Sequence, residues 1–227
     1  MERLSDIFLE LQDKCANNIN LVTATHFVPQ VAEALVKAKN KGLVIPVVYN
    51  SSAYENVSTL NMLDGLVDVY LPDMKYIDSR LSAEYSKAPD YADVAKAAIH
   101  EMVRQTGKPE FFIVDDELVK SGRVEAGIMK KGVIVRHLVL PGTTKDSKAV
   151  IKYLIDTYGD DIYISIMSQY TPFERLKKHP LLSRKVTRKE YNSVVDYAID
   201  CGINNGFIQE GDVAEESFIP EFDYEGI

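Results

Sequence analysis

The chain is poor in cysteine, with only Cys15 and Cys201 in 227 residues. The two lie far apart in segments with helical patterns, so no disulfide framework is indicated and a reducing, cytoplasmic environment is expected. The four histidines show no spacing typical of metal ligands. The composition therefore predicts no metal site built from these residue types.

The chain also lacks a basic block and a long apolar run. Its formal net charge is −8, which argues against electrostatic binding to nucleic acid. No apolar segment is long enough to span a bilayer, and no signal peptide is recognisable. Solenoid repeats and low-complexity segments are missing as well. We therefore expect a cytoplasmic protein with neither nucleic acid nor a membrane as its partner.

What the sequence does contain is a regular alternation of apolar segments, in a length sufficient for one large domain. Short β-branched runs predict strands at about residues 18–23, 43–49, 67–71, 133–140, 161–167 and 204–208. Helical periodicity predicts helices at 2–16, 28–41, 56–65, 80–87, 90–106, 146–158 and 187–201. Because βαβ crossovers are right-handed, this order indicates an α/β fold with a parallel sheet.

Three segments stand outside this alternation. Residues 110–130 contain two extended runs around a polar turn and predict an inserted β-hairpin. Residues 174–185 form a polar loop with several basic residues and His179, and residues 212–227 form an acidic, aromatic tail. The hairpin and the loop are candidate docking surfaces because they are extra and exposed.

An acid and an amine stand together where the strand at 67–71 ends. Pro72 stops that strand because it has no backbone N–H, and Asp73 and Lys75 follow on one side of the extended chain. In α/β folds the carboxyl ends of the strands form the binding face, so this pair is suited to a zwitterionic or metal-bound ligand. The alternative is a solvated ion pair worth less than about 1 kcal/mol.

Other strands leave through polar residues too. Thr25, Asn50 and the Gln169–Thr171 segment each follow a predicted strand, and all these exits fall on one rim of a parallel sheet. The pattern favours a barrel or half-barrel with its ligand at the strand ends. For Thr25 the alternative is an ordinary helix start.

In this order, the segments THF, YNSSAYE, YLPDMKY, VRHLVLPG and SIMSQYTP resemble the radical S-adenosylmethionine proteins. The similarity is greatest to the uncharacterised branch related to the pyruvate formate-lyase activating enzymes, and it runs to the tail SFIPEFDYEGI. The resemblance implies a partial (β/α) barrel and a [4Fe–4S] cluster. It also implies reductive cleavage of S-adenosylmethionine to a 5′-deoxyadenosyl radical.

One motif of that family is missing. The family holds its cluster through three cysteines, C-x3-C-x2-C, after the first barrel strand, and Cys15 and Cys201 form no such motif. The chain resembles a barrel that lacks its first strand and the cysteine loop. We therefore expect residues 1–227 to form a single, shortened radical S-adenosylmethionine domain that is inactive in isolation.

The resemblance also implies S-adenosylmethionine-binding positions. Lys75 matches a lysine that meets the methionine carboxylate, and Asp73 matches the acid of the same Asp-x-Lys motif. Arg136 matches an arginine within the strand before Val-Pro-Gly, and strand alternation predicts that His137 points to the opposite face. The full set of expected cofactor-binding residues is Thr25, Asn50, Asp73, Lys75, Arg136, Gln169 and Thr171.

Alternatives remain open for the function. The chain is either an enzyme of this type, acting on a glycyl-radical protein or a small substrate, or a non-catalytic ligand-binding protein. A third interpretation places the cysteine-bearing segment on another polypeptide. An open sheet edge would favour such pairing with a second chain.

Overall fold

A parallel sheet with helices packed on one face organises the molecule. The computed structural model describes residues 1–112, 128–173, 176 and 178–208. The strands run in the order β1-β2-β3-β5-β6-β7, and every neighbouring pair on this path is parallel. β4 pairs antiparallel with the start of β5. The predicted α/β partial barrel is confirmed.

In chain order the described helices and strands are α1 (Glu2–Asp13), β1 (Ile19–Val22), α2 (Val28–Asn40), β2 (Val47–Ser51), α3 (Val57–Leu60), β3 (Val69–Pro72), α4 (Ser79–Ser86), α5 (Tyr91–Thr106), β4 (Glu110–Phe111), β5 (Met129–Leu138), α7 (Thr144–Tyr158), β6 (Tyr163–Met167), α8 (Arg188–Asp200) and β7 (Gly206–Ile208). None of these helices is both long and apolar enough to cross a membrane. Each predicted strand overlaps one of the observed parallel strands.

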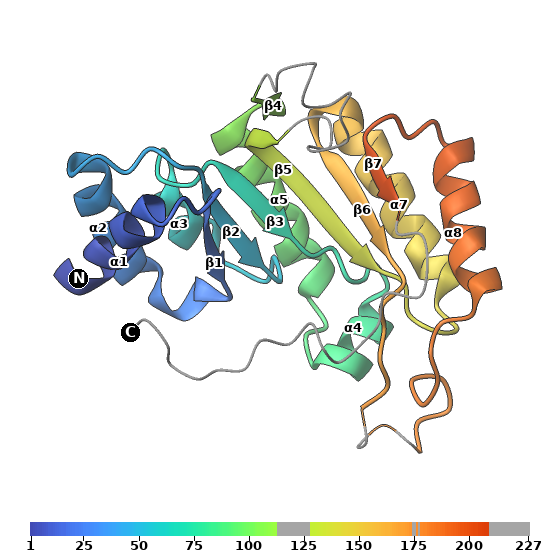
Figure 1. Cartoon of the computed structure of the whole chain (residues 1–227). Coiled ribbons are helices and arrows are strands. Elements are labelled where there is room, and N and C mark those ends of the chain that lie inside the picture. The colour runs from blue at the N-terminus through green and yellow to red at the C-terminus, as the bar shows by residue number, and fades with distance from the viewer. Residues whose placement is uncertain (113–127, 174–175, 177, 209–227) are drawn as a thin grey trace.

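The two faces of the sheet differ in what covers them. Figure 1 shows α5 and α7 behind the strands, with the opposite face turned toward the viewer. On β5, Val133 and Val135 are fully buried and His137 is 1% exposed, whereas Arg136 and Leu138 on the alternate face are only partly buried. The uncovered face therefore carries the side chains that are available to a ligand.

The second strand begins later than the sequence pattern predicts. Residues 43–45 do not pair with β1; instead Gln12 of α1 accepts hydrogen bonds from the amides of Val44 and Ile45 at 2.7 and 3.2 Å. Val44 is 83% exposed. Pro46 precedes the paired segment, and its missing N–H makes it a poor strand-interior residue. The apolar run therefore divides into a loop and a strand.

Two further boundaries differ from the prediction. The helix expected at 56–65 is a single α-turn, α3, followed by a 3₁₀ turn at Asn61–Leu63. β5 begins at Met129, so residues 129 and 130 at the end of the predicted hairpin are the first part of a long strand. Residues 113–127 of that hairpin and the tail at 212–227 lie outside the described residues.

The sheet is weakly joined between β3 and β5. Regular pairing covers Val69 with Gly132 and Tyr70 with Val133, after which only an isolated bridge links Asp73 to Arg136. Pro72 explains the interruption, because it offers no amide hydrogen to its neighbour. On the carboxyl side of Pro72, β5 and the chain that follows β3 are connected mainly through side chains.

Thr187 and Glu190 have the spacing in the sequence that predicts a capping box, and helix α8 begins with it. The Thr187 hydroxyl accepts from the Glu190 amide at 3.2 Å, and Glu190 accepts from the Thr187 amide at 2.9 Å. Glu190 also accepts from the Gly142 amide at 2.8 Å, so the cap holds the turn that follows β5. Gly142 has a φ of +77°, and a Cβ there would lie 2.8 Å from Leu181.

We predict that Thr187→Ala lowers the free energy of unfolding by about 1 kcal/mol, because the first turn of α8 loses a cap acceptor. Urea titration followed by circular dichroism measures the change. Asn192→Ala, an exposed substitution in the same helix, is the matched control and should be within about 0.5 kcal/mol of wild type. Equal losses in both variants would contradict a specific role for the cap.

Candidate ligand site at the carboxyl rim of the sheet

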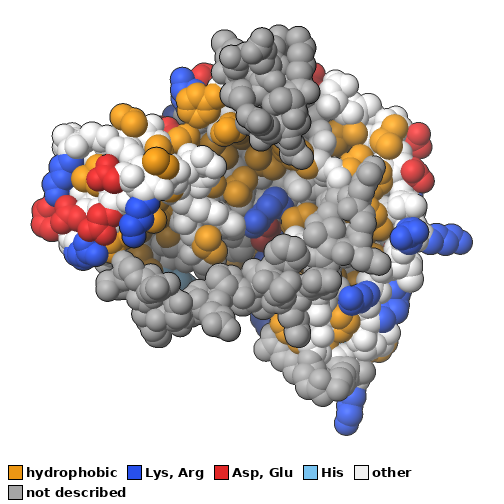
Figure 2. Space-filling model, in the orientation of Figure 1, with side chains coloured by type: hydrophobic (Ala, Val, Ile, Leu, Met, Phe, Trp, Pro, Cys, Tyr) orange, Lys and Arg blue, Asp and Glu red, His pale blue; other side chains and the backbone are white. Residues whose placement is uncertain are grey.

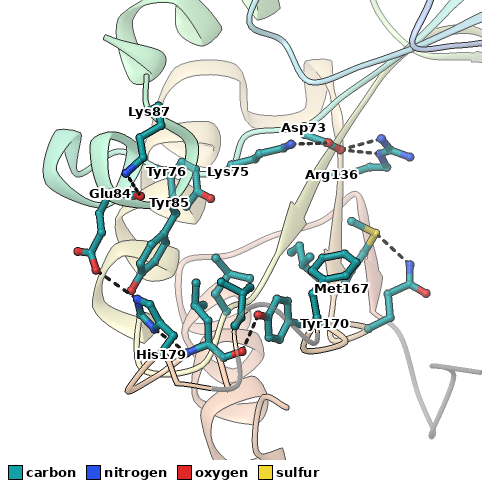
Figure 3. A pocket seen from close by; sticks show the side chains of 16 residues that line it. Asp73, Lys75, Tyr76, Glu84, Tyr85, Lys87, Arg136, Met167, Tyr170 and His179 are labelled. Carbon is teal, nitrogen blue, oxygen red and sulfur yellow. Dashed lines mark hydrogen bonds and ion pairs between the residues drawn. The ribbon is translucent and has the colours of Figure 1, made fainter. Parts of the chain in front are cut away.

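Four of the predicted site residues meet at the carboxyl ends of β2, β3 and β5. Arg136 donates from Nε to Oδ1 of Asp73 at 3.0 Å and from Nη2 to the Asn50 side-chain oxygen at 2.6 Å. Lys75 Nζ lies 3.7 Å from Oδ2 of Asp73. Figure 3 shows Lys75 and Arg136 approaching Asp73 from opposite sides. We call Asn50, Asp73, Lys75 and Arg136 the rim cluster.

The rim cluster carries one positive charge in excess. Arg136 and Asp73 are well enclosed, with 25% and 22% of their side chains exposed, while Lys75 is 41% exposed. An enclosed ion pair is screened less by solvent than an exposed one, so the guanidinium holds the carboxylate firmly. Lys75, being longer and more exposed, is the cation with room to contact a ligand.

A pocket of about 830 Å³ opens beside the rim cluster. Asp73, Lys75 and Arg136 line it together with Gln169, and Leu138 and Met167 form part of its apolar wall. Figure 2 shows basic and acidic side chains side by side in the middle of this face, bordered by apolar ones. The combination of a few polar groups with an apolar lining is typical of small-molecule sites.

Aromatic side chains from α4, from the loop before it and from the loop after β6 form the far wall of the pocket. The rings of Tyr76 and Tyr85 lie 6.2 Å apart, and Tyr85 contacts the His179 ring at 5.5 Å. Tyr170 donates its hydroxyl to the Leu182 carbonyl at 2.8 Å. Burial raises the pKa of Tyr76, Tyr85 and Tyr170 above the usual range, so these three hydroxyls stay protonated at neutral pH.

His179 fastens the loop to α4. Its Nδ1 accepts from the amides of Leu181 and Leu182 at 3.2 and 3.0 Å. The proton is therefore on Nε2, which lies 3.3 Å from the Glu84 carboxylate. The sequence marked His179 only as part of a basic loop. Its role in the pocket wall depends on packing that no local pattern reveals.

Thr25 lies in a different polar group from the rim cluster. It donates to Oε1 of Glu55 at 3.1 Å, and Tyr49 donates to Oε2 of the same carboxylate at 2.8 Å. Ser51 also donates to Glu55, which is only 4% exposed. Glu55 is not among the residues predicted from the sequence, although a single acid among small and apolar residues after a strand is a usable signal.

The two remaining predicted residues lie differently with respect to the pocket. Gln169 lines it, with Nε2 3.6 Å from the Met167 sulfur. Thr171 is exposed and does not line the pocket. The structure thus brings five of the seven predicted residues to one pocket or its rim, and leaves Thr25 and Thr171 outside it.

His137 points to the opposite face from Arg136, as strand alternation predicts. Its Nδ1 lies 2.8 Å from the Met74 carbonyl, so Nδ1 carries the proton. Nε2 has no hydrogen-bond partner among the described residues. Burial lowers the pKa of His137, because the charged form would lose its hydration in the core. The neutral ring therefore supports the β3 exit from behind.

The cysteines do not provide a cluster site. Cys15 is exposed after α1, and Cys201 caps the end of α8. No group of three or more metal-ligating side chains is found in the part of the chain that the structure describes. A [4Fe–4S] cluster requires about three protein thiolates, and the whole sequence has two. The residues of this chain therefore do not fit such a cluster.

Comparison with known proteins shows likeness at the level of the fold. No protein-family model matches the chain. The uncharacterized protein MJ0674 of Methanocaldococcus jannaschii is 29% identical over 154 residues, which are 68% of this chain and 38% of that protein. The chain thus matches well under half the length of this curated relative.

A solved structure shares the arrangement of the sheet. It is a domain of pyruvate-formate lyase-activating enzyme from Bacteroides vulgatus, with a TM-score of 0.53 and 11% sequence identity. The match covers 85% of this chain and 98% of that domain. The fold is therefore like that of a pyruvate-formate lyase-activating enzyme domain, as the sequence resemblance implied.

We predict that the free energy of unfolding rises with pH up to about 6.5, the ordinary pKa of a histidine in an unfolded chain. The folded pKa of His137 is depressed, so the unfolded chain binds more protons below that value. Stability is therefore lost as pH falls through this region. Urea titrations from about pH 8 to 5 measure the slope. His137→Gln should flatten it, and an unchanged slope would contradict the assignment.

Proposed function

We propose that this chain binds S-adenosylmethionine at the rim cluster and its pocket, as the ligand-holding part of a radical S-adenosylmethionine-type system. The observation that supports this most strongly is the convergence of one ammonium and one guanidinium on Asp73 at the mouth of an apolar pocket. S-adenosylmethionine has a charged amino-acid end and a larger nucleoside end. The charged rim cluster suits the amino-acid end, and the largely apolar pocket suits the nucleoside end.

Individual residues take separate tasks in this proposal. Lys75 meets the ligand carboxylate with a charge-assisted hydrogen bond, which contributes roughly 1.5–3 kcal/mol. Asp73 balances the charge of the ligand's ammonium group, and Arg136 keeps the Asp73 carboxylate in place. Asn50 and Gln169 add polar contacts to the ligand. The apolar and aromatic lining surrounds the uncharged part of the ligand.

Radical chemistry in this proposal needs thiolates from outside the chain. The sequence contains two cysteines, and the cluster of the family requires three. The described chain leaves one edge of β1 without a neighbouring strand, and Val22 at that edge is 64% exposed. An unprotected edge of a parallel sheet favours addition of a further strand. A cysteine-bearing polypeptide is thus the proposed partner, and a glycyl-radical protein is the proposed substrate of the assembled system.

We predict that S-adenosylmethionine binds the wild-type chain with a dissociation constant of about millimolar to tens of micromolar. Lys75→Ala should weaken binding by about 10- to 100-fold, because the carboxylate loses its charged donor. Isothermal titration calorimetry measures both. Lys152→Ala, which removes an exposed lysine of α7 paired with Asp156, is the control and should bind like wild type. Absence of binding, or equal affinity in Lys75→Ala, would overturn the proposal.

We predict that the isolated chain, treated anaerobically with iron and sulfide, gains no [4Fe–4S] absorbance and cleaves no S-adenosylmethionine. The physical reason is the shortage of thiolate ligands. Iron analysis and electron paramagnetic resonance after reduction make the measurement. A stoichiometric, reducible cluster signal would show that the chain supplies its own ligands.

A further inference from the structure

A single tyrosine hydroxyl connects the exits of β2 and β3. Tyr91 is the first residue of α5 and is 3% exposed. Its hydroxyl oxygen lies 2.7 Å from the Asp73 carbonyl and 3.0 Å from the Ser52 carbonyl, and it accepts from the Lys75 amide at 3.0 Å. Asp73 and Lys75 are the charged residues of the proposed ligand contact. The backbone carbonyl of the first and the backbone amide of the second both bond to the Tyr91 hydroxyl.

Hydrogen-bond accounting shows that the Lys75 amide depends on this hydroxyl. A phenol has one hydrogen to donate and two acceptor sites. The Lys75 amide uses an acceptor site, and the two carbonyls share the hydrogen, with the shorter contact going to Asp73. Without the hydroxyl, the amide of Lys75 would keep no partner in a partly buried position, which is costly.

Packing fixes where this hydroxyl lies. The Tyr91 ring stacks on Tyr54 at 6.0 Å and contacts the edge of Tyr76 at 5.6 Å. Tyr54 is itself tied to the cap of α5, since its hydroxyl donates to Asp90 at 2.7 Å. The oxygen is therefore held by rings on two sides, and it transmits the position of α5 to the β3 exit.

We propose that Tyr91 is a positioning residue of the ligand site, which fixes the backbone from Asp73 to Lys75 so that the Lys75 ammonium faces the pocket. The inference rests on the proposed function, because its affinity test uses S-adenosylmethionine. Tyr91 is not a member of the rim cluster, and in this proposal it does not contact the ligand. Its hydroxyl orients the residues that do make contact.

The matched pair for the test is Tyr91→Phe and Tyr70→Phe. Both remove one buried hydroxyl that links β3 to its surroundings; that of Tyr70 donates to Gln105 of α5, away from the rim. We expect both variants to lose stability, and only Tyr91→Phe to bind S-adenosylmethionine more weakly, by about tenfold. Equal affinity losses in the two variants, or none in Tyr91→Phe, would overturn the inference.

A double-variant comparison separates positioning from a general loosening. Because Tyr91 acts through Lys75, the affinity losses of Tyr91→Phe and Lys75→Ala should overlap in the double variant. Fully additive losses would mean that Tyr91 acts by another route, and would overturn the inference.

Amide hydrogen exchange tests the same idea in the ligand-free chain. In Tyr91→Phe the Lys75 amide should exchange at least about tenfold faster, while the Met74 amide, which donates to Arg136, keeps its protection. Tyr70→Phe should change neither. If wild type binds no S-adenosylmethionine, the proposed function fails, yet faster exchange confined to Lys75 still supports the positioning role. Unchanged exchange overturns it.

Discussion

The ion pair between Asp73 and Arg136 is the contact on which the site depends. Regular pairing of β3 with β5 ends early. After Pro72 the two segments are held together by this ion pair, by one backbone bridge and by the hydrogen bond between His137 and the Met74 carbonyl. The pair therefore closes the sheet at the place where the pocket opens. Because both groups are largely enclosed, loss of either partner would leave the other charge poorly compensated.

This arrangement gives the two cations of the rim different tasks. Arg136 is committed to Asp73 and Asn50, so its guanidinium is part of the scaffold. Lys75 makes a longer contact and remains more exposed, so its ammonium is the group that a ligand reaches at least cost. A rim with one fixed cation and one available cation is better suited to bind an anionic group of a ligand than a rim in which both cations are restrained.

The proposed function separates the holding of a ligand from radical chemistry. The polar exits of the strands and the pocket are present in one chain, whereas the thiolates of an iron–sulfur cluster are too few. Likeness to an activating-enzyme domain at 11% identity establishes the arrangement of strands and helices, and a shared fold does not by itself carry a shared activity. The chemistry proposed for the site therefore stands on the geometry of its own side chains.

The sequence by itself determined the order of the strands, their parallel arrangement and the cap at Thr187, because these follow from local periodicity and short-range hydrogen bonds. It also marked Asn50 and Asp73 as polar groups at strand ends, and the family resemblance marked Arg136 within its strand. Only the tertiary structure decided that Arg136 meets residues 63 and 86 positions earlier in the chain. It likewise turned Thr25 toward Glu55.

The aromatic pocket wall and the Tyr91 hydroxyl were equally beyond the sequence. They come from α4 and the loop before it, from α5 and from the loop after β6. A tyrosine at the start of a helix has no local signature of its future partners. Periodicity specifies which face of an element is buried. Which elements then meet across the rim depends on how the whole sheet twists and how the helices pack against it.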